Sequence, residues 1–176
     1  ALSGDNLGVK GEYYQLEEFP VEPATVARIP MIIGWGVKGK TRSLAGKYSE
    51  EFNIYAGPKD TLQNSMNLFK SVASENGRDE KALEITTACP PVVGLTKESV
   101  DNSLITAAKA LIQPEDEIAK NWKERSYLYG TPEDVVKTLS MWQEVGIEAV
   151  YLQLLDLEQS KRNESVEVIQ KAINLL

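Results

Sequence analysis

The feature that most constrains the fold is an alternation of short apolar runs with longer helical patterns. Four runs rich in β-branched and aromatic residues are predicted strands, at residues 29–34, 52–56, 83–93 and 149–155. Amphipathic patterns with capping signals predict helices at residues 61–74, 99–111 and 135–144. Runs that are apolar on both faces are typical of buried parallel strands. The alternation therefore predicts an α/β fold whose parallel strands are joined by right-handed crossovers.

The predicted order is strand, helix, strand, helix, strand, two helices, strand and helix. Before the first strand, Pro20, Pro23 and Pro30 make the chain extended and irregular. We therefore predict an irregular connecting segment over residues 1–27 and a single domain of βα units over residues 28–176.

Composition narrows the classes of partner. The chain has 176 residues, of which 42% are hydrophobic, enough for the core of one globular domain. Its net charge of -7 disfavours nucleic acids and anionic membranes, because binding to both depends on neutralising phosphates. No run approaches the ~20 apolar residues of a membrane span. We expect no nucleic-acid or membrane partner, and the cytoplasm is the default location.

Two absences limit the chemistry. The chain has no histidine, which removes the commonest general base, the usual catalytic triads and most zinc sites, and we expect no metal. Its one cysteine, Cys89, lies in an apolar stretch, where a buried structural thiol is a better interpretation than a nucleophile. The chemistry is therefore expected to come from a bound cofactor.

A glycine-rich octapeptide, GWGVKGKT at residues 34–41, follows the first predicted strand. It satisfies both the dinucleotide-binding pattern G-x-G-x-x-G and the P-loop pattern G-x-x-x-x-G-K-T. Glycines allow successive backbone N–H groups to face a ligand, and the following helix N-terminus adds positive partial charge. Both interpretations predict an anion site. The alternative is a tight strand-to-helix turn with no ligand.

The two motifs make different demands on the rest of the chain. A dinucleotide site needs an acidic residue at the end of the next strand, but that strand ends in Tyr55-Ala56-Gly57. A P-loop needs a magnesium-binding aspartate after another strand, and Asp156 follows the fourth predicted strand. Asp156 is equally well interpreted as an ordinary residue at a strand end.

Several stretches, in a fixed order along nearly the whole chain, match motifs of one enzyme family. They are GEYYQL at 11–16, IPMIIG at 29–34, Thr41 with Leu44, Ala45, Tyr48 and Phe52-Asn53, NGRD at 76–79 before the strand at 83–87, and GTPEDV at 130–135 with GIEA at 146–149. In these stretches the chain resembles the luciferase-like family of flavin-dependent monooxygenases and deazaflavin-dependent oxidoreductases, which are TIM barrels.

The resemblance implies a cofactor site at the octapeptide. Gly34, Trp35, Gly36 and Val37 would lie at the carboxyl end of a barrel strand, with Thr41 just beyond. Their backbone N–H groups would meet the phosphate of FMN or of the deazaflavin coenzyme F420. Trp35 and Val37 stand where the family usually has small residues. Trp35 would either stack near a ring or pack beneath the loop.

The number of strands implies half a barrel. A closed (β/α)8 barrel needs ~250 residues, and this chain supplies four strands, by resemblance the last four. In this family the N-terminal half of the barrel ordinarily carries many of the catalytic polar groups. That half is missing here, so no catalytic residue can be named. Exposed sheet edges invite pairing. We expect either a fragment of a full-length enzyme or a chain that pairs with another, such as a second copy of itself.

The resulting hypothesis is the C-terminal, cofactor-binding part of a luciferase-like oxidoreductase or monooxygenase acting on a small-molecule substrate. Two alternatives stay open. One is a P-loop nucleotide hydrolase that uses GWGVKGKT, and the other is a non-catalytic half-barrel kept for assembly.

Overall fold

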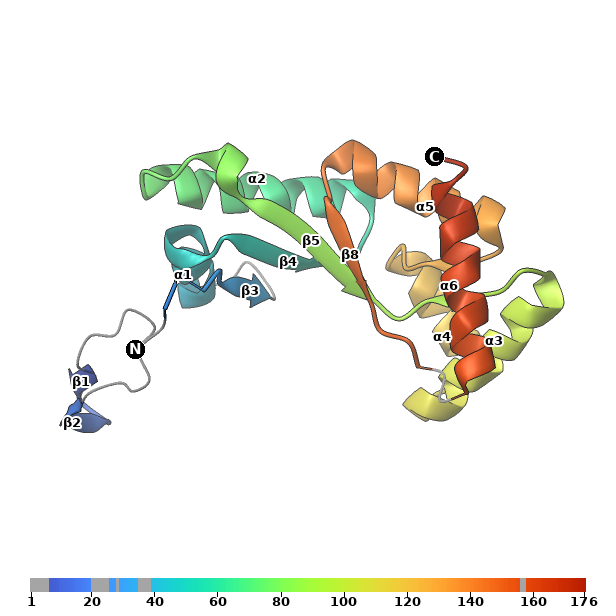
Figure 1. Cartoon of the computed structure of the whole chain (residues 1–176), viewed down its shortest axis with the longest axis horizontal. Coiled ribbons are helices and arrows are strands. Elements are labelled where there is room, and N and C mark those ends of the chain that lie inside the picture. The colour runs from blue at the N-terminus through green and yellow to red at the C-terminus, as the bar shows by residue number, and fades with distance from the viewer. Residues whose placement is uncertain (1–6, 20–25, 28, 35–38, 156–157) are drawn as a thin grey trace. The chain divides into compact units, whose positions relative to one another are not determined.

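The computed structural model describes residues 7–19, 26–27, 29–34, 39–155 and 158–176 (Figure 1). The chain divides into two compact units, residues 1–31 and 32–176. In the first, β1 (Leu7–Lys10) pairs antiparallel with β2 (Gln15–Phe19), and the Gly11 N–H donates to the Tyr14 carbonyl at 2.8 Å. The sequence pattern does not predict this hairpin. The domain division at residues 27 and 28 stays a prediction.

The second unit is built on a parallel sheet of four strands in the order β3-β4-β5-β8. The strands are β3 (Ile32–Gly34), β4 (Glu51–Tyr55), β5 (Glu84–Cys89) and β8 (Ala149–Leu152). The helices are α1 (Gly39–Tyr48), α2 (Lys59–Glu75), α3 (Lys97–Leu111), α4 (Glu115–Glu124), α5 (Pro132–Val145) and α6 (Gln159–Ile173), with a 3-10 turn η1 (Glu80–Ala82). Strand order follows chain order without reversal, as in a barrel wound in one direction.

The apolar run at residues 83–93 forms two strands in different sheets, so the prediction of one strand there is wrong. Strand β5 ends at Cys89, and Pro90 and Pro91 follow, which have no N–H to continue a ladder. Strand β6 (Val92–Val93) then pairs with β7 (Tyr129–Gly130) in a separate parallel sheet. Two other strands are shorter than the predicted runs: β3 begins only after Pro30, and β8 ends at Leu152.

Between β5 and β8 the chain forms three helices, where two are predicted. The additional helix is α4, whose buried residues are only Ile118 and Trp122. These two side chains lie one turn apart, and charged residues occupy most of the other positions. So narrow an apolar stripe is a weak periodic signal, which explains why sequence analysis misses this helix.

Predicted caps begin and end helix α5. Thr131 is its N-cap, Pro132 takes the first helical position, and the Asp134 carboxylate accepts from the Thr131 backbone N–H at 3.4 Å. Gly146 ends the helix with φ 93°, a left-handed conformation that favours glycine. The chain therefore turns directly from α5 toward strand β8.

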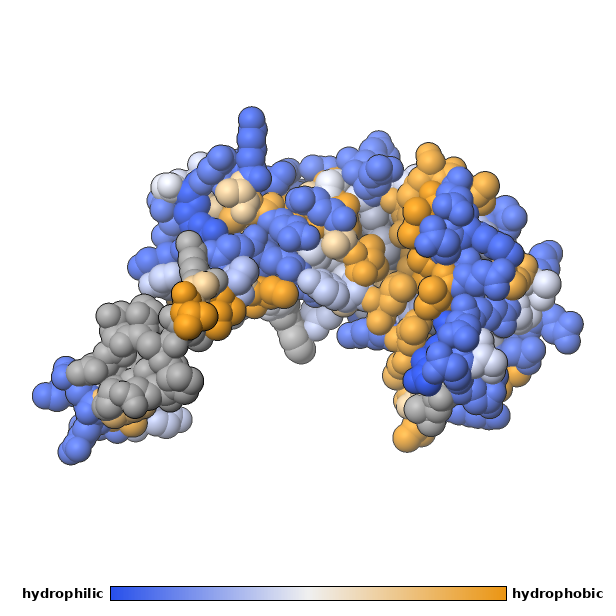
Figure 2. All heavy atoms as spheres, viewed as in Figure 1, coloured by the Kyte–Doolittle hydropathy of each residue, from blue (hydrophilic) through white to orange (hydrophobic). Residues whose placement is uncertain are grey.

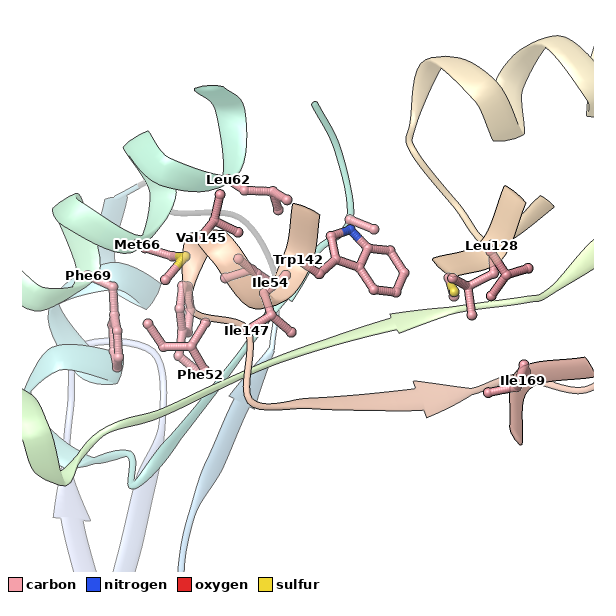
Figure 3. Close-up of a cluster of buried hydrophobic side chains, with 14 of the residues drawn as sticks. Phe52, Ile54, Leu62, Met66, Phe69, Leu128, Trp142, Val145, Ile147 and Ile169 are labelled. Atoms are coloured by element: carbon pink, nitrogen blue, oxygen red, sulfur yellow. The ribbon is translucent and has the colours of Figure 1, made fainter. Parts of the chain in front are cut away.

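The register of the sheet assigns alternate residues to two faces. We call the face that packs against the helices the outer face. Its residues Phe52, Ile54, Ile85 and Cys89 are buried in one hydrophobic cluster with side chains of α2, α5 and α6. Phe52 stacks on Phe69 with ring centroids 4.3 Å apart. Figure 3 shows this cluster, with Leu62, Met66 and Phe69 of α2 and Trp142 and Val145 of α5 gathered around Phe52 and Ile54.

The burial of Cys89 confirms its interpretation as a structural thiol. Its side chain is fully buried among outer-face residues, and it forms no disulfide. Burial raises the pKa of the Cys89 thiol to about 11, which keeps it protonated and unreactive near neutral pH.

Apolar surface is exposed next to the end strand of the sheet. Figure 2 shows hydrophobic side chains at the surface beside α6. On this helix and just beyond it, Val166, Ile173 and Leu176 are each about half exposed. Among the described residues, β3 and β8 each pair with a strand on one side only. Both observations fit the expectation of a sheet that ends where a closed barrel would continue.

Candidate functional site

The face of the sheet opposite the helices has polar side chains at its centre, and we call it the inner face. Register and alternation assign to it Glu51, Asn53 and Tyr55 of β4, Glu84, Thr86 and Ala88 of β5, and Ala149 and Tyr151 of β8, with Ile32 and Gly34 of β3 at its edge. Barrel interiors are ordinarily filled with bulky branched apolar residues. A polar inner face therefore indicates a role beyond packing.

Four inner-face side chains form one hydrogen-bonded network across three strands. The Thr86 hydroxyl is fully buried and donates to Glu51 Oε1 at 2.6 Å. The Asn53 Nδ2 group donates to Thr86 Oγ1 at 2.8 Å. The Tyr151 hydroxyl donates to Glu51 Oε2 at 3.2 Å. Both oxygens of the buried Glu51 carboxylate are thus satisfied, which buried charges require.

The network also affects Tyr151. The hydrogen bond to Glu51 raises the pKa of its phenol, and the negative charges of Glu51 and Glu84 raise that pKa further. Tyr151 therefore remains a hydrogen-bond donor throughout the physiological pH range.

A pocket of about 340 Å³ opens where the four strands end. Its lining residues are Gly34, Asn53, Tyr55, Ala88, Tyr127 and Gln153. Each strand of the sheet contributes a residue at or just beyond its carboxyl end. No lining side chain is charged; the polar groups are two amides and two phenols. Such a lining suits a flat, uncharged ring with hydrogen-bonding edges.

One wall of the pocket comes from outside the sheet. Tyr127 lies between α4 and β7, and its ring packs edge-on against Trp122 with centroids 5.4 Å apart. The Trp122 indole N–H donates to the Pro90 carbonyl at 2.8 Å, just beyond the end of β5. Helix α4 therefore holds Tyr127 beside the strand ends.

The predicted cofactor residues are only partly described by the structure. Gly34 ends β3 and lines the pocket. Trp35, Gly36 and Val37 lie outside the described residues, as does Asp156. Thr41 is exposed in the first turn of α1, which contains no acidic residue. The structure thus brings Gly34 to the pocket and begins helix α1 five residues beyond it, at Gly39.

Sequence reasoning finds only Gly34 among the pocket residues and misses the other five, which are Asn53, Tyr55, Ala88, Tyr127 and Gln153. A signal existed only for Asn53, a polar residue between two buried apolar neighbours in a predicted strand. Strand alternation places such a residue on the opposite face from those neighbours. No local pattern marks Tyr127 or Gln153.

Three larger cavities have other linings, and one of them, of about 530 Å³, lies beside Tyr127, Tyr129 and the first turns of α5. Of the other two, one of about 550 Å³ is lined mainly by α3 and α6, and one of about 480 Å³ by α5, the start of β8 and the C-terminal residues. We favour the smaller pocket because ligands of parallel α/β sheets bind at the carboxyl ends of the strands. Within the described ranges, no cluster of three or more His, Cys, Asp or Glu residues could hold a metal ion.

No helix in the described part of the chain is both long and apolar enough to cross a membrane.

Comparisons with known proteins bear on this site. A family model described as luciferase-like monooxygenase matches residues 1–149. A search of curated proteins finds no match. Among solved structures, an F420-dependent secondary alcohol dehydrogenase in complex with an F420-acetone adduct is 20% identical, with a TM-score of 0.69 over 97% of this chain and 57% of that one.

Two further solved structures are similar. The coenzyme F420-dependent tetrahydromethanopterin reductase from Methanopyrus kandleri is 14% identical, with a TM-score of 0.69 over 99% of this chain and 59% of that one. A riboflavin lyase with modified FMN and its substrate riboflavin is 13% identical, with a TM-score of 0.65 over 97% of this chain and 48% of that one. This chain spans about half the length of these structures. The predicted α/β half-barrel is thereby confirmed.

Proposed function

Because this chain belongs to the luciferase-like monooxygenase family, we propose that it is the cofactor-binding part of an oxidoreductase that uses a flavin or deazaflavin. The observation that carries the proposal is the pocket at the carboxyl edge of the sheet. Gly34 belongs both to this pocket and to the glycine-rich octapeptide whose last residues begin α1. A phosphate site and a ring site would therefore be neighbours.

The phosphate of FMN or F420 would be bound by backbone N–H groups of Gly34, Trp35, Gly36 and Val37 and by Thr41. The N-terminus of α1 carries positive partial charge that no acidic side chain in its first turn offsets. The residues present thus fit an anion. The phosphate would orient the rest of the cofactor toward the strand ends.

The ring would occupy the pocket formed by Asn53, Tyr55, Tyr127 and Gln153. Its volume of about 340 Å³ lies within the range of small-molecule sites. The tyrosines offer aromatic surface, and the amides offer polar contacts at the ring edge. The cofactor would supply the redox chemistry, while these residues would bind it, orient it and exclude water.

The substrate site and the catalytic groups would come from the remainder of the barrel. The chain spans about half the length of its solved structural neighbours, and among the described residues β3 and β8 each pair with a strand on one side only. We propose that the missing strands, in the same polypeptide or in a second copy, close the barrel over this face. The substrate would be a small molecule held against the ring.

A ligand titration tests the proposal. Quenching of cofactor fluorescence should reveal saturable binding of FMN or F420. For FMN, riboflavin is the matched control ligand, and it should bind about tenfold more weakly or worse because it lacks the charge-assisted phosphate contacts. Equal affinity for FMN and riboflavin would contradict the phosphate site, and no saturable binding of either cofactor would contradict the proposal.

A pair of variants tests the phosphate contact. Thr41→Val removes a hydroxyl from the third residue of α1, and Thr61→Val removes one from the third residue of α2. Thr41→Val should weaken the binding of FMN roughly threefold to tenfold and leave the affinity for riboflavin unchanged. Thr61→Val should change neither affinity.

The same titration separates the alternatives. A P-loop hydrolase would bind magnesium-ATP, and the Lys40→Ala variant would lose this binding. An assembly module would bind neither ATP nor flavin. P-loop and dinucleotide folds bind ligands where the strand order reverses, and this sheet has no reversal among its described strands. Topology therefore favours the flavin-type site.

A further inference from the structure

The inner-face network has a fixed direction. A carboxylate only accepts hydrogen bonds, so the proton between Glu51 and Thr86 belongs to the Thr86 hydroxyl. With its single proton engaged, Thr86 Oγ1 can act toward Asn53 only as an acceptor. The Asn53 side chain must therefore present its NH2 group to Thr86, as the 2.8 Å contact records.

This direction determines what Asn53 offers to the pocket. An amide that turns Nδ2 toward Thr86 keeps its carbonyl oxygen Oδ1 for another partner. Asn53 lines the pocket, and no described residue donates to Oδ1. Thr86 is fully buried and Glu51 nearly so, which holds the amide in this orientation. The pocket thus contains a pre-oriented acceptor on an uncharged wall.

We infer that Asn53 Oδ1 accepts a hydrogen bond from a ring N–H of the cofactor. Flavins and deazaflavins share one such group, the imide N–H that lies between two ring carbonyls. The inference rests on the proposed function and adds which group of the ring the site recognises. Glu51 and Thr86 act as positioning residues, because they reach the ligand only through Asn53.

Neighbouring groups are compatible with the same ring edge. Gln153 follows β8, which pairs with β5 on the side opposite β4, and it contributes a second amide to the pocket. Its side chain can donate to a carbonyl beside the imide N–H. Tyr55 and Tyr127 provide the aromatic surface. A charged ligand would find no opposite charge among the lining residues.

The test compares FMN with FMN methylated at the imide nitrogen, which loses the donor and keeps the phosphate. Wild-type protein should bind FMN about tenfold more tightly than the methylated analogue. This comparison needs no variant. Equal affinities would overturn the inference and leave the proposed function standing, whereas failure to bind either ligand would overturn both.

Two variants test the role of Thr86. Thr86→Val cuts the link between Glu51 and Asn53, so the amide is free to reverse. FMN should then bind roughly threefold to tenfold more weakly, and the preference over the methylated analogue should fall to within about twofold. A preserved preference in folded Thr86→Val would overturn the positioning role.

Thr87→Val is the matched control. Thr87 is equally buried at the next position, but it faces the helices, and its hydroxyl donates to the Ile54 carbonyl at 2.9 Å. This variant should retain the full preference for FMN. Loss of the preference in both variants would show a general effect of disturbing β5 and would overturn the inference.

Discussion

The two faces of the four-stranded sheet use neighbouring residues in opposite ways. On β4, Phe52 and Ile54 are buried against helices, whereas Asn53 belongs to a polar network and lines a pocket. On β5, Thr86 and Thr87 are both fully buried, yet one hydroxyl bonds to a side chain of the network and the other to backbone.

The difference teaches which face carries which property. The outer face gains its stability from burying apolar surface against α2, α5 and α6, so its residues determine whether the unit folds. On the inner face, buried polar side chains form hydrogen bonds with one another, and these bonds fix the orientation of particular atoms. Substitutions on the outer face should therefore alter stability first, and those on the inner face should alter ligand recognition first.

The largest effect is expected from Phe52→Ala. Phe52 is 1% exposed and stacks on Phe69, so truncation leaves a cavity between sheet and α2. The free energy of unfolding should fall by about 3–5 kcal/mol, as measured by urea denaturation. Tyr55→Ala, on the inner face of the same strand, should cost roughly 1 kcal/mol or less. Equal losses would contradict the division between the faces.

Cys89 reports the integrity of the outer face. Because burial raises the pKa of its thiol to about 11, a thiol reagent at neutral pH should label native protein about a hundredfold or more slowly than protein in urea. The raised pKa also means that this group's contribution to stability is complete below about pH 8.5 and is lost as the pH rises toward 11. Rapid labelling of native protein would show an open core.

Gly46→Ala probes the closeness of the helix layer. A Cβ at Gly46 in α1 would overlap the Val72 side chain in α2, so the two helices must separate. Unfolding free energy should fall by about 1–3 kcal/mol. Ser43→Ala, at an exposed position of the same helix, serves as the control and should change stability by about 0.5 kcal/mol or less. An unchanged stability in Gly46→Ala would indicate that α1 and α2 pack loosely.

The smallest effect concerns the titration of Tyr151. Glu51→Gln should lower the pKa of its phenol, because the hydrogen bond to the carboxylate is the main cause of its raised value. Glu84→Gln should lower that pKa less, since Glu84 acts through charge alone. Ultraviolet titration of each protein against its Tyr151→Phe counterpart isolates the signal.

The sign of the pH effect follows from the same hydrogen bond. The stabilisation from a phenol with a raised pKa is complete below the ordinary value near 10 and is lost as the pH rises through the raised value. An unchanged Tyr151 titration in Glu51→Gln would contradict the network.

Much of the fold could be predicted from local pattern, because βα alternation and the Thr131 cap are encoded in adjacent residues. Helix α4 and the break at Pro90 and Pro91 were beyond this reasoning. The helix has two buried residues only, and a continuous apolar run does not reveal which sheet each part joins.

The candidate site was less accessible to prediction. The glycine pattern identifies Gly34, but Tyr127 reaches the pocket only because α4 and β7 bring it there. The polar character of Asn53 was a signal in the sequence. The orientation of its amide, however, depends on Thr86 in β5 and, through Thr86, on Glu51 in β4. Long-range contacts of this kind leave no local trace. The roles of Trp35, Gly36, Val37 and Thr41 stay predictions.

The central claim is that a flavin-type cofactor binds at the inner face, where the strands end. Nitrogen–proton NMR during titration with FMN tests it directly, because the side-chain amides of Asn53 and Gln153 give their own signals. Both signals should move saturably, with one dissociation constant that agrees with fluorescence quenching. Unmoved signals, or shifts confined to the Asn102 side chain in the cavity between α3 and α6, would contradict the account.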